Sequence, residues 1–142
     1  MNKSVNVRVT RRFEASAERV FDAFLDPATA RKFLFATPTG KMVRVDIDPR
    51  VGGRFVIVER RDGEEAGHYG TYIEIERPRR LVFDFSVDAA MAEPTRVTIE
   101  IAARGSGCEL TLTHEGVWAD YRKRTEDGWT TILESLGAAL AS

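Results

Sequence analysis

The C-terminal stretch from Trp118 to Leu140 carries the clearest periodic pattern in the chain. Its apolar side chains recur at positions i, i+3, i+4, i+7 and i+11, which places them on one face of a helix. These side chains are Trp129, Ile132, Leu133, Leu136 and Leu140. A helix that begins near Asp120 would be roughly 30 Å long, about the width of a small domain. Such a helix needs a broad apolar surface to lie on.

The preceding chain supplies that surface, because most of it alternates apolar and polar residues with the period of a half-buried strand. A first strand is expected within residues 5–13, and six more follow between Lys41 and Val117. Ser16 and Asp26 are placed to cap two short helices between them, over about 17–25 and 27–33. Tight turns between the later strands indicate antiparallel neighbours. The sequence predicts a single α+β domain over residues 1–142, in which a curved antiparallel sheet packs against the C-terminal helix.

Composition excludes several classes of protein. The 142 residues are 43% hydrophobic and 30% charged, as in an ordinary globular protein, and the net charge of −1 lacks the basic surplus of a nucleic-acid-binding protein. Cys108 is the only cysteine, so no intrachain disulfide can form. No apolar run is long enough to cross a bilayer, and Met1 to Thr10 lacks the apolar region of a signal peptide. We therefore expect a soluble, cytoplasmic protein without a transmembrane segment.

Gly70 and Gly128 lie inside a predicted strand and the predicted long helix, which suggests close backbone approach at both points. If the helix touches the sheet near Gly128 and the sheet curves, the two must diverge elsewhere and leave a cavity. Tyr69 is assigned to the inward face in preference to Tyr72, because it shares the parity of Ile73 and Ile75. The predicted lining is Phe35, Phe55, Ile57, Tyr69, Phe83, Phe85, Ile99, Leu112, His114, Trp118, Trp129 and Leu133. The alternative is that these large side chains fill the space as a dry core.

Few polar side chains are candidates for chemistry. His114 shares the inward parity of Leu110 and Leu112, where it could hydrogen-bond a ligand or act as a general base. The alternative is a histidine satisfied by a backbone or helix-cap partner. His68 is expected at the rim or surface, and Glu59 either at the cavity mouth or at a solvent-exposed strand end.

The sequence points to no cofactor or metal, because its two histidines and single cysteine have no ligand spacing and no glycine-rich loop precedes a helix. The loops 35–40 and 88–94 are candidate gates to the cavity, or ordinary surface loops.

Five stretches together resemble a known family. They are FEASAERVFDAFLDP (13–27), DPRVGGRF (48–55), GTYIEIERPRRLVF (70–83), LTLTHEG (110–116) and GW (128–129). They resemble the START-like, birch-pollen-allergen-like helix-grip superfamily (SRPBCC), and within it the branch similar to the C-terminal domain of activators of the heat-shock protein 90 ATPase. This resemblance covers essentially the whole chain.

The resemblance implies a helix-grip fold: a seven-stranded antiparallel sheet, two short helices, and a long C-terminal helix over a cavity. Members of the superfamily bind sterols, lipids, polyketides and plant hormones, and some are cyclases or hydrolases. It implies no single activity and no universal catalytic residues.

These observations lead to one hypothesis of function and two alternatives. The first is a binding protein that holds a small hydrophobic molecule, lipid-like or polyketide- or aromatic-like, between sheet and helix. One alternative is a cyclase- or hydrolase-type enzyme that uses His114 as acid or base. The other is a chaperone-ATPase-activator-like module with a protein partner. A homodimer is compatible with each of them.

Overall fold

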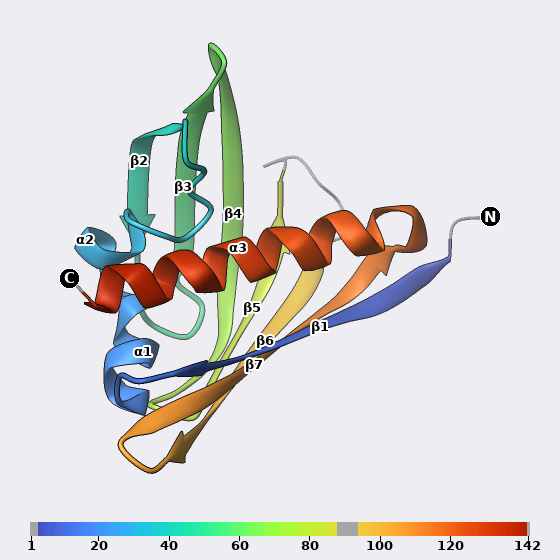
Figure 1. The fold of residues 1–142 in the computed structure, drawn as a ribbon. Coiled ribbons are helices and arrows are strands. Elements are labelled where there is room, and N and C mark those ends of the chain that lie inside the picture. Colours follow the sequence, from blue (N-terminus) through green and yellow to red (C-terminus); the bar gives the residue numbers. More distant parts are fainter. Residues whose placement is uncertain (1–2, 88–93, 142) are drawn as a thin grey trace.

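The structure is a computed structural model that describes residues 3–87 and 94–141, and its elements follow the predicted order (Figure 1). Strand β1 (Ser4–Phe13) leads into two short helices, α1 (Ala17–Ala23) and α2 (Pro27–Ala30). Six strands come next: β2 (Lys41–Ile47), β3 (Arg54–Arg61), β4 (Glu64–Glu76), β5 (Arg80–Ser86), β6 (Thr95–Arg104) and β7 (Gly107–Trp118). A 3-10 turn, η1 (Ala119–Tyr121), precedes the long helix α3 (Arg122–Ala141).

All seven strands form one antiparallel sheet in the order β1-β7-β6-β5-β4-β3-β2. Strands β2 to β6 each pair with the next strand along the chain, as the tight turns predict. The β3–β4 hairpin turns at Asp62 and Gly63, where φ is +49° and +82°, the signs that a type I′ turn requires. Strand β1 pairs with β7, so the first and last strands are neighbours.

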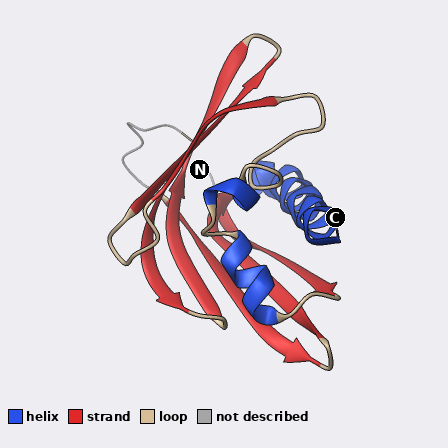
Figure 2. Ribbon diagram, turned by 90° about the vertical axis from the view of Figure 1, so that its left-hand side faces the viewer, coloured by secondary structure: helices blue, strands red, loops and turns tan. Residues whose placement is uncertain are grey.

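The two short helices begin at the predicted caps. The Ser16 hydroxyl accepts a hydrogen bond from the Arg19 N–H at 3.2 Å, and the Asp26 carboxylate accepts one from the Ala28 N–H at 3.3 Å. Helix α2 ends at Ala30 rather than near residue 33, because the chain there continues as turns. All three helices lie on the concave side of the curved sheet (Figure 2).

Helix α3 crosses the concave side of the sheet (Figure 1). Trp129, Ile132, Leu133 and Leu136 are buried and Leu140 is half-buried, which confirms the predicted stripe. The helix packs mainly against β1 and less against β7 and α1. The predicted helix-grip architecture is therefore the observed one.

The two glycines singled out from the sequence behave differently. A Cβ added at Gly70 would lie 2.0 Å from a ring carbon of Phe55, so this ring packs directly on the bare backbone of β4. Nothing lies within 4 Å of a Cβ added at Gly128, so the predicted close approach of α3 to the sheet there is wrong. Near the other end of the helix, a Cβ added at Gly137 would make ordinary contacts of 3.7–3.9 Å with Arg11 and Phe13 of β1.

A β-bulge in β4 reverses the face assignment of its tyrosines. The pairing with β5 shifts between Tyr72 and Glu74, so Tyr72 pairs with Phe83 and Ile75 with Leu81 on the same face. An extra residue, Ile73, occupies the bulge and is exposed. Simple alternation therefore gave the wrong result. Tyr72 is the buried tyrosine, whereas Tyr69 is half-buried on the opposite face with its ring over Gly67.

Candidate functional site

The concave face of the sheet carries most of the predicted lining side chains. Ten of the twelve are buried: Phe35, Phe55, Ile57, Phe83, Phe85, Ile99, Leu112, His114, Trp129 and Leu133. The exceptions are Tyr69 and Trp118. Trp118 was predicted to line the cavity, but 53% of it is exposed and its ring stacks on Tyr121, at the point where β7 ends and η1 begins.

Phe35 lies at the centre of this face, although it belongs to the loop between α2 and β2. Its ring stacks almost parallel on the imidazole of His68, with centroids 4.4 Å apart, and on Phe85 at 5.1 Å. Phe55 lies beside it at 6.1 Å, and Trp129 of α3 meets it at 5.5 Å with the planes inclined by 60°. We call Phe35, Phe55, His68, Phe85, His114 and Trp129 the aromatic cluster. It joins β3, β4, β5 and β7 of the sheet to α3.

The backbone of Phe35 is unusual for such a residue. Its φ is +57°, in the left-handed region that side chains with a Cβ rarely adopt. This conformation costs roughly 1–2 kcal/mol for a residue other than glycine. A phenylalanine held there must be stabilised by its surroundings, and at functional sites such strain is often part of the mechanism.

His114 is held by hydrogen bonds through both ring nitrogens. The indole N–H of Trp129 donates to Nδ1 at 3.0 Å, so Nδ1 carries no proton, and the Nε2–H donates to the Thr95 hydroxyl at 2.7 Å. The Thr95 hydroxyl donates onward to the Phe85 carbonyl at 3.1 Å. A chain of three bonds thus runs from α3 through β7 and β6 to β5.

Burial within this series of hydrogen bonds keeps the His114 imidazole neutral. Only 6% of the residue is exposed, and burial lowers the pKa of its imidazole from 6.5 to about 4. General acid–base catalysis near neutral pH requires a free nitrogen and a pKa near the working pH. The arrangement at His114 therefore favours an orienting role over proton transfer.

His68 is buried rather than at the rim, with 8% of it exposed. It shares the alternation of Gly70 and Tyr72, which pair with Phe85 and Phe83 and lie on the concave face. Its Nδ1–H donates to the Ile57 carbonyl on the neighbouring strand at 3.2 Å, and burial lowers the pKa of the imidazole to about 4. One signal in the sequence could have predicted the burial of His68. Gly70, two residues further along the strand, was already expected to lie at a point of close backbone approach.

Glu59 anchors the loop that carries Phe35. Only 1% of this residue is exposed, and its two carboxylate oxygens accept the Thr37 N–H at 2.7 Å and the Thr37 hydroxyl at 2.9 Å. Arg61 donates to the same carboxylate at 2.5 Å and also to the Phe35 carbonyl at 3.2 Å. Burial alone would raise the pKa of Glu59, but these bonds outweigh it and hold the pKa below its usual value.

The close fit of this anchor requires Gly40. A Cβ added there would lie 2.2–2.6 Å from the Glu59 carboxyl atoms, so any side chain would displace the carboxylate. Of the two expected gates, the loop 35–40 therefore lies against the aromatic cluster and is tied to β3. The second, the loop 88–94, falls almost entirely outside the described residues.

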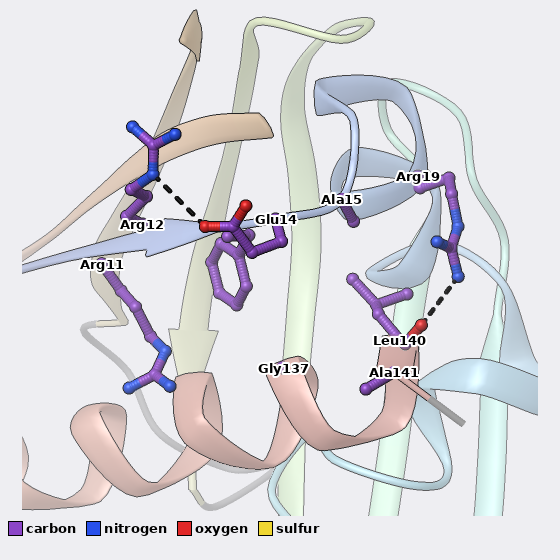
Figure 3. A pocket seen from close by; sticks show the side chains of 9 residues that line it. Arg11, Arg12, Glu14, Ala15, Arg19, Gly137, Leu140 and Ala141 are labelled. Atoms are coloured by element: carbon purple, nitrogen blue, oxygen red, sulfur yellow. Dashed lines mark hydrogen bonds and ion pairs between the residues drawn. The ribbon is translucent and has the colours of Figure 1, made fainter. Parts of the chain in front are cut away.

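A separate groove lies at the C-terminal end of α3 (Figure 3). It has a volume of about 360 Å³ and is lined by the end of β1, the start of α1 and the last turns of α3. Arg11, Arg12 and Arg19 are among its lining residues. Nothing in the sequence pattern singled it out, because its residues come from opposite ends of the chain.

Within the described ranges, no three His, Cys, Asp or Glu side chains gather as they would around a metal ion. In the same ranges, no helix combines the length and apolar character needed to cross a membrane.

A curved antiparallel sheet that holds a long C-terminal helix through an aromatic and imidazole contact defines a domain of the START-like helix-grip class. The chain belongs to the family described as Activator of Hsp90 ATPase homolog 1-like protein, whose family model matches residues 14–141.

Solved structures of similar proteins agree with this fold. A protein from Chromobacterium violaceum is 28% identical with a TM-score of 0.84, and the match covers 94% of each chain. A protein from Rhizobium loti is 27% identical with a TM-score of 0.79, over 98% of this chain and 99% of that one. The AHSA1-like protein from Aeromonas hydrophila has a TM-score of 0.84 at 20% identity, over 96% and 92% of the two chains, a likeness of fold alone.

Among characterised proteins, the chain is similar to a segment of the ToMV susceptible protein tm-2 of Solanum lycopersicum. The two are 31% identical over an alignment of 112 residues, and the match covers 68% of this chain and 13% of the tomato protein. The chain thus spans only a small part of that relative.

Proposed function

We propose that this protein binds a small hydrophobic molecule, lipid-like or polyketide- or aromatic-like, between the concave face of the sheet and α3. The observation that carries the proposal is the position of Phe35. Its ring fills the centre of the aromatic cluster from a loop, with a left-handed backbone that stores strain. We propose that the ligand takes the place of this ring, and that the strain released lowers the cost of moving it.

The surroundings of Phe35 suit such an exchange. Phe55, Phe85 and Trp129 offer ring faces and edges to an apolar body, and at one side Thr95, His114 and Trp129 satisfy one another's hydrogen bonds. An apolar cavity on the order of 150 Å³ is enough to admit a benzene-sized molecule. A planar aromatic compound is therefore the first class of ligand to test, and a larger one would require further movement of the loop.

The test combines discovery of a ligand with a defined probe. Native mass spectrometry of protein purified from a lipid-containing extract would reveal a molecule that co-purifies. Indole, titrated into the protein and into Phe35→Ala, should shift the Trp129 indole N–H resonance and bind the variant at least tenfold more tightly. Absence of a co-purifying molecule, together with no indole-dependent shift in either protein, would overturn the proposal.

The family name supports a second candidate, a protein-interaction module that stimulates the heat-shock protein 90 ATPase. A pulldown with that chaperone and a measurement of its ATPase rate with and without this protein distinguish the two. Stimulation that is unaffected by Phe35→Ala would assign the function to the outer surface rather than to the aromatic cluster.

An acid–base enzyme that uses His114 is the weakest of the three candidates. Both ring nitrogens are engaged, and burial holds the pKa of the imidazole at about 4. A substrate would have to displace Thr95 or Trp129 before it could exchange a proton with this residue.

A further inference from the structure

The groove at the C-terminal end of α3 offers room for a ligand away from the aromatic cluster. Its volume is about 360 Å³, within the range of small-molecule sites. Phe13, Leu140 and Ala141 supply apolar wall, and Arg11 and Arg19 approach it from opposite sides (Figure 3). It lies beside α3 at the β1 edge of the sheet, so it is distinct from the aromatic cluster around Phe35.

The three arginines around the groove differ in whether their guanidinium groups have a partner. The Arg12 guanidinium lies 3.6 Å from the Glu14 carboxylate, and the Arg19 guanidinium donates to the Leu140 carbonyl at 3.0 Å. Arg11 differs from both. Its Nε is shut off from solvent and has no hydrogen-bond partner among residues 3–87 and 94–141. The guanidinium carbon instead lies 5.9 Å from the centroid of the Phe13 ring.

An unpaired buried donor on a charged side chain calls for an explanation, because buried polar groups almost always have a partner. A hydrogen-bond acceptor on a bound ligand would be the missing partner of this donor. The guanidinium of Arg11 carries Nε–H and Nη–H groups in a planar fork, which matches the two oxygens of a carboxylate once the side chain turns this edge into the groove.

Gly137 deepens the groove. A glycine inside a helix is unfavourable relative to alanine, and here a Cβ would make only ordinary contacts of 3.7–3.9 Å with Arg11 and Phe13. Packing against the sheet therefore does not require glycine at this position. Its effect is to leave bare helix backbone beside the apolar wall, where a ligand can lie close to α3.

We infer that this groove binds a small monocarboxylate with an apolar body, such as a medium-chain fatty acid. The carboxylate pairs with Arg11, and the body lies along Phe13, Gly137 and Leu140. A singly charged anion fits better than a phosphate. The C-terminal end of α3 carries partial negative charge, and Glu14 adds a further negative charge at the rim. Both would repel a second charge on the ligand.

The experiment uses the whole chain with sodium octanoate, and 1-octanol and inorganic phosphate as comparison ligands. Octanoate should shift the Arg11 Nε–H resonance and leave the Trp129 indole N–H unchanged, whereas octanol and phosphate should bind at least tenfold more weakly. A shift at Trp129 without one at Arg11 would overturn the inference and assign the fatty acid to the aromatic cluster. Phosphate binding as tight as octanoate binding would overturn the monocarboxylate assignment.

Two pairs of variants test the geometry. Arg11→Gln removes the charge, and its control is Arg8→Gln on the exposed side of the same strand. Gly137→Leu fills the groove, and its control is Gly128→Leu, where the added side chain meets open space. The first member of each pair should bind octanoate at least tenfold more weakly than its control. Equal affinities within the Gly137 pair would overturn the inference even if Arg11→Gln fails to fold.

Discussion

The indole N–H of Trp129 donates to Nδ1 of His114 across 3.0 Å, and this bond joins the buried face of α3 to β7. Both side chains lie in the core, where water cannot replace either partner. The bond therefore fixes the rotation of α3 about its own axis, which apolar contacts alone define only loosely. It also fixes which ring nitrogen of His114 carries the proton.

Replacement of Trp129 by phenylalanine should destabilise the protein. The variant keeps an aromatic ring but leaves Nδ1 of His114 without a donor, and a buried unsatisfied acceptor costs about 1–3 kcal/mol. Loss of ring volume adds to this cost. Chemical denaturation measures the effect. Trp118→Phe is the matched control, because Trp118 is exposed and its change should stay within about 0.5 kcal/mol. Equal effects of the two substitutions would contradict the role assigned to Trp129.

Glu59→Gln should loosen the loop that carries Phe35. The amide keeps the size of the carboxylate but offers only one acceptor oxygen, so the bonds to Thr37 and Arg61 cannot all persist. We expect a loss of about 1–3 kcal/mol in unfolding free energy and faster hydrogen exchange at the Thr37 amide. Glu65→Gln is the control, since its pair with Arg60 is exposed and 3.5 Å long. Unchanged hydrogen exchange at the Thr37 amide would contradict the role of Glu59 in holding this loop.

Stability should decline as the pH falls below neutrality. Burial lowers the pKa of both His68 and His114 from 6.5 to about 4. Between these values the unfolded chain binds protons that the folded chain does not. The unfolding free energy therefore decreases with falling pH, by roughly 3 kcal/mol per histidine at the lower limit.

Denaturation at pH 7 and pH 5 measures the effect of the histidines apart from that of Glu59. The pKa of Glu59 is lowered in the folded protein, so the stability that this carboxylate contributes is lost only below its usual pKa of 4.5. The environments of the two histidines differ. His114 is bonded to Thr95 and Trp129, while Glu59 and Arg61 also act on His68 with opposite sign. An unfolding free energy that is equal at pH 7 and pH 5 would be incompatible with two buried neutral imidazoles.

Periodicity predicted the architecture because helix and strand patterns both depend on which side faces the core. The stripe from Trp129 to Leu140 and the alternating residues of the strands predicted the long helix and the seven strands, and ten of the twelve residues expected to line a cavity are buried. The errors have local causes. Because of the bulge in β4, Tyr69 was predicted to face inward, whereas Tyr72 does. Side chains alternate between the two faces only while the strand pairing is regular. Trp118 was misplaced because β7 leaves the core at that residue.

Other features of the site had no signal in local sequence. Glu59 joins β3 to a loop about 22 residues earlier in the chain. The hydrogen bonds of its carboxylate depend on a close fit against Gly40, and no sequence motif encodes that fit. Similarly, Thr95 is an ordinary strand residue until the fold brings it to His114. Contacts between distant segments require the three-dimensional arrangement.

Alanine substitution at two glycines should have opposite effects. Gly70→Ala would place a Cβ 2.0 Å from the Phe55 ring, so the ring or the strand must shift, at a cost of about 1–3 kcal/mol. Gly128→Ala meets open space on α3 and should stabilise the protein by about 0.5–1 kcal/mol through helix propensity. Thermal unfolding of both variants tests this. A stable Gly70→Ala would mean that Phe55 has room to move.

The backbone of Phe35 allows a test that separates strain from packing. Phe35→Ala and Phe35→Gly both remove the ring, but only glycine accepts a φ of +57° without penalty. We therefore expect Phe35→Gly to be more stable than Phe35→Ala by about 1 kcal/mol. The reverse order holds at most positions in regular structure. If alanine is the more stable of the two, the loop does not hold this residue under strain.

The pairing of β1 with β7, beneath α3, has a consequence for synthesis. Strand β1 finds its partners only when residues 107–118 and 122–141 have been made. At about 5–20 residues per second, the N-terminal strand waits several seconds with its hydrogen-bonding groups exposed. The fold is therefore expected to be completed only after α3 has left the ribosome, and the nascent chain should be a target for chaperones that capture unpaired strands.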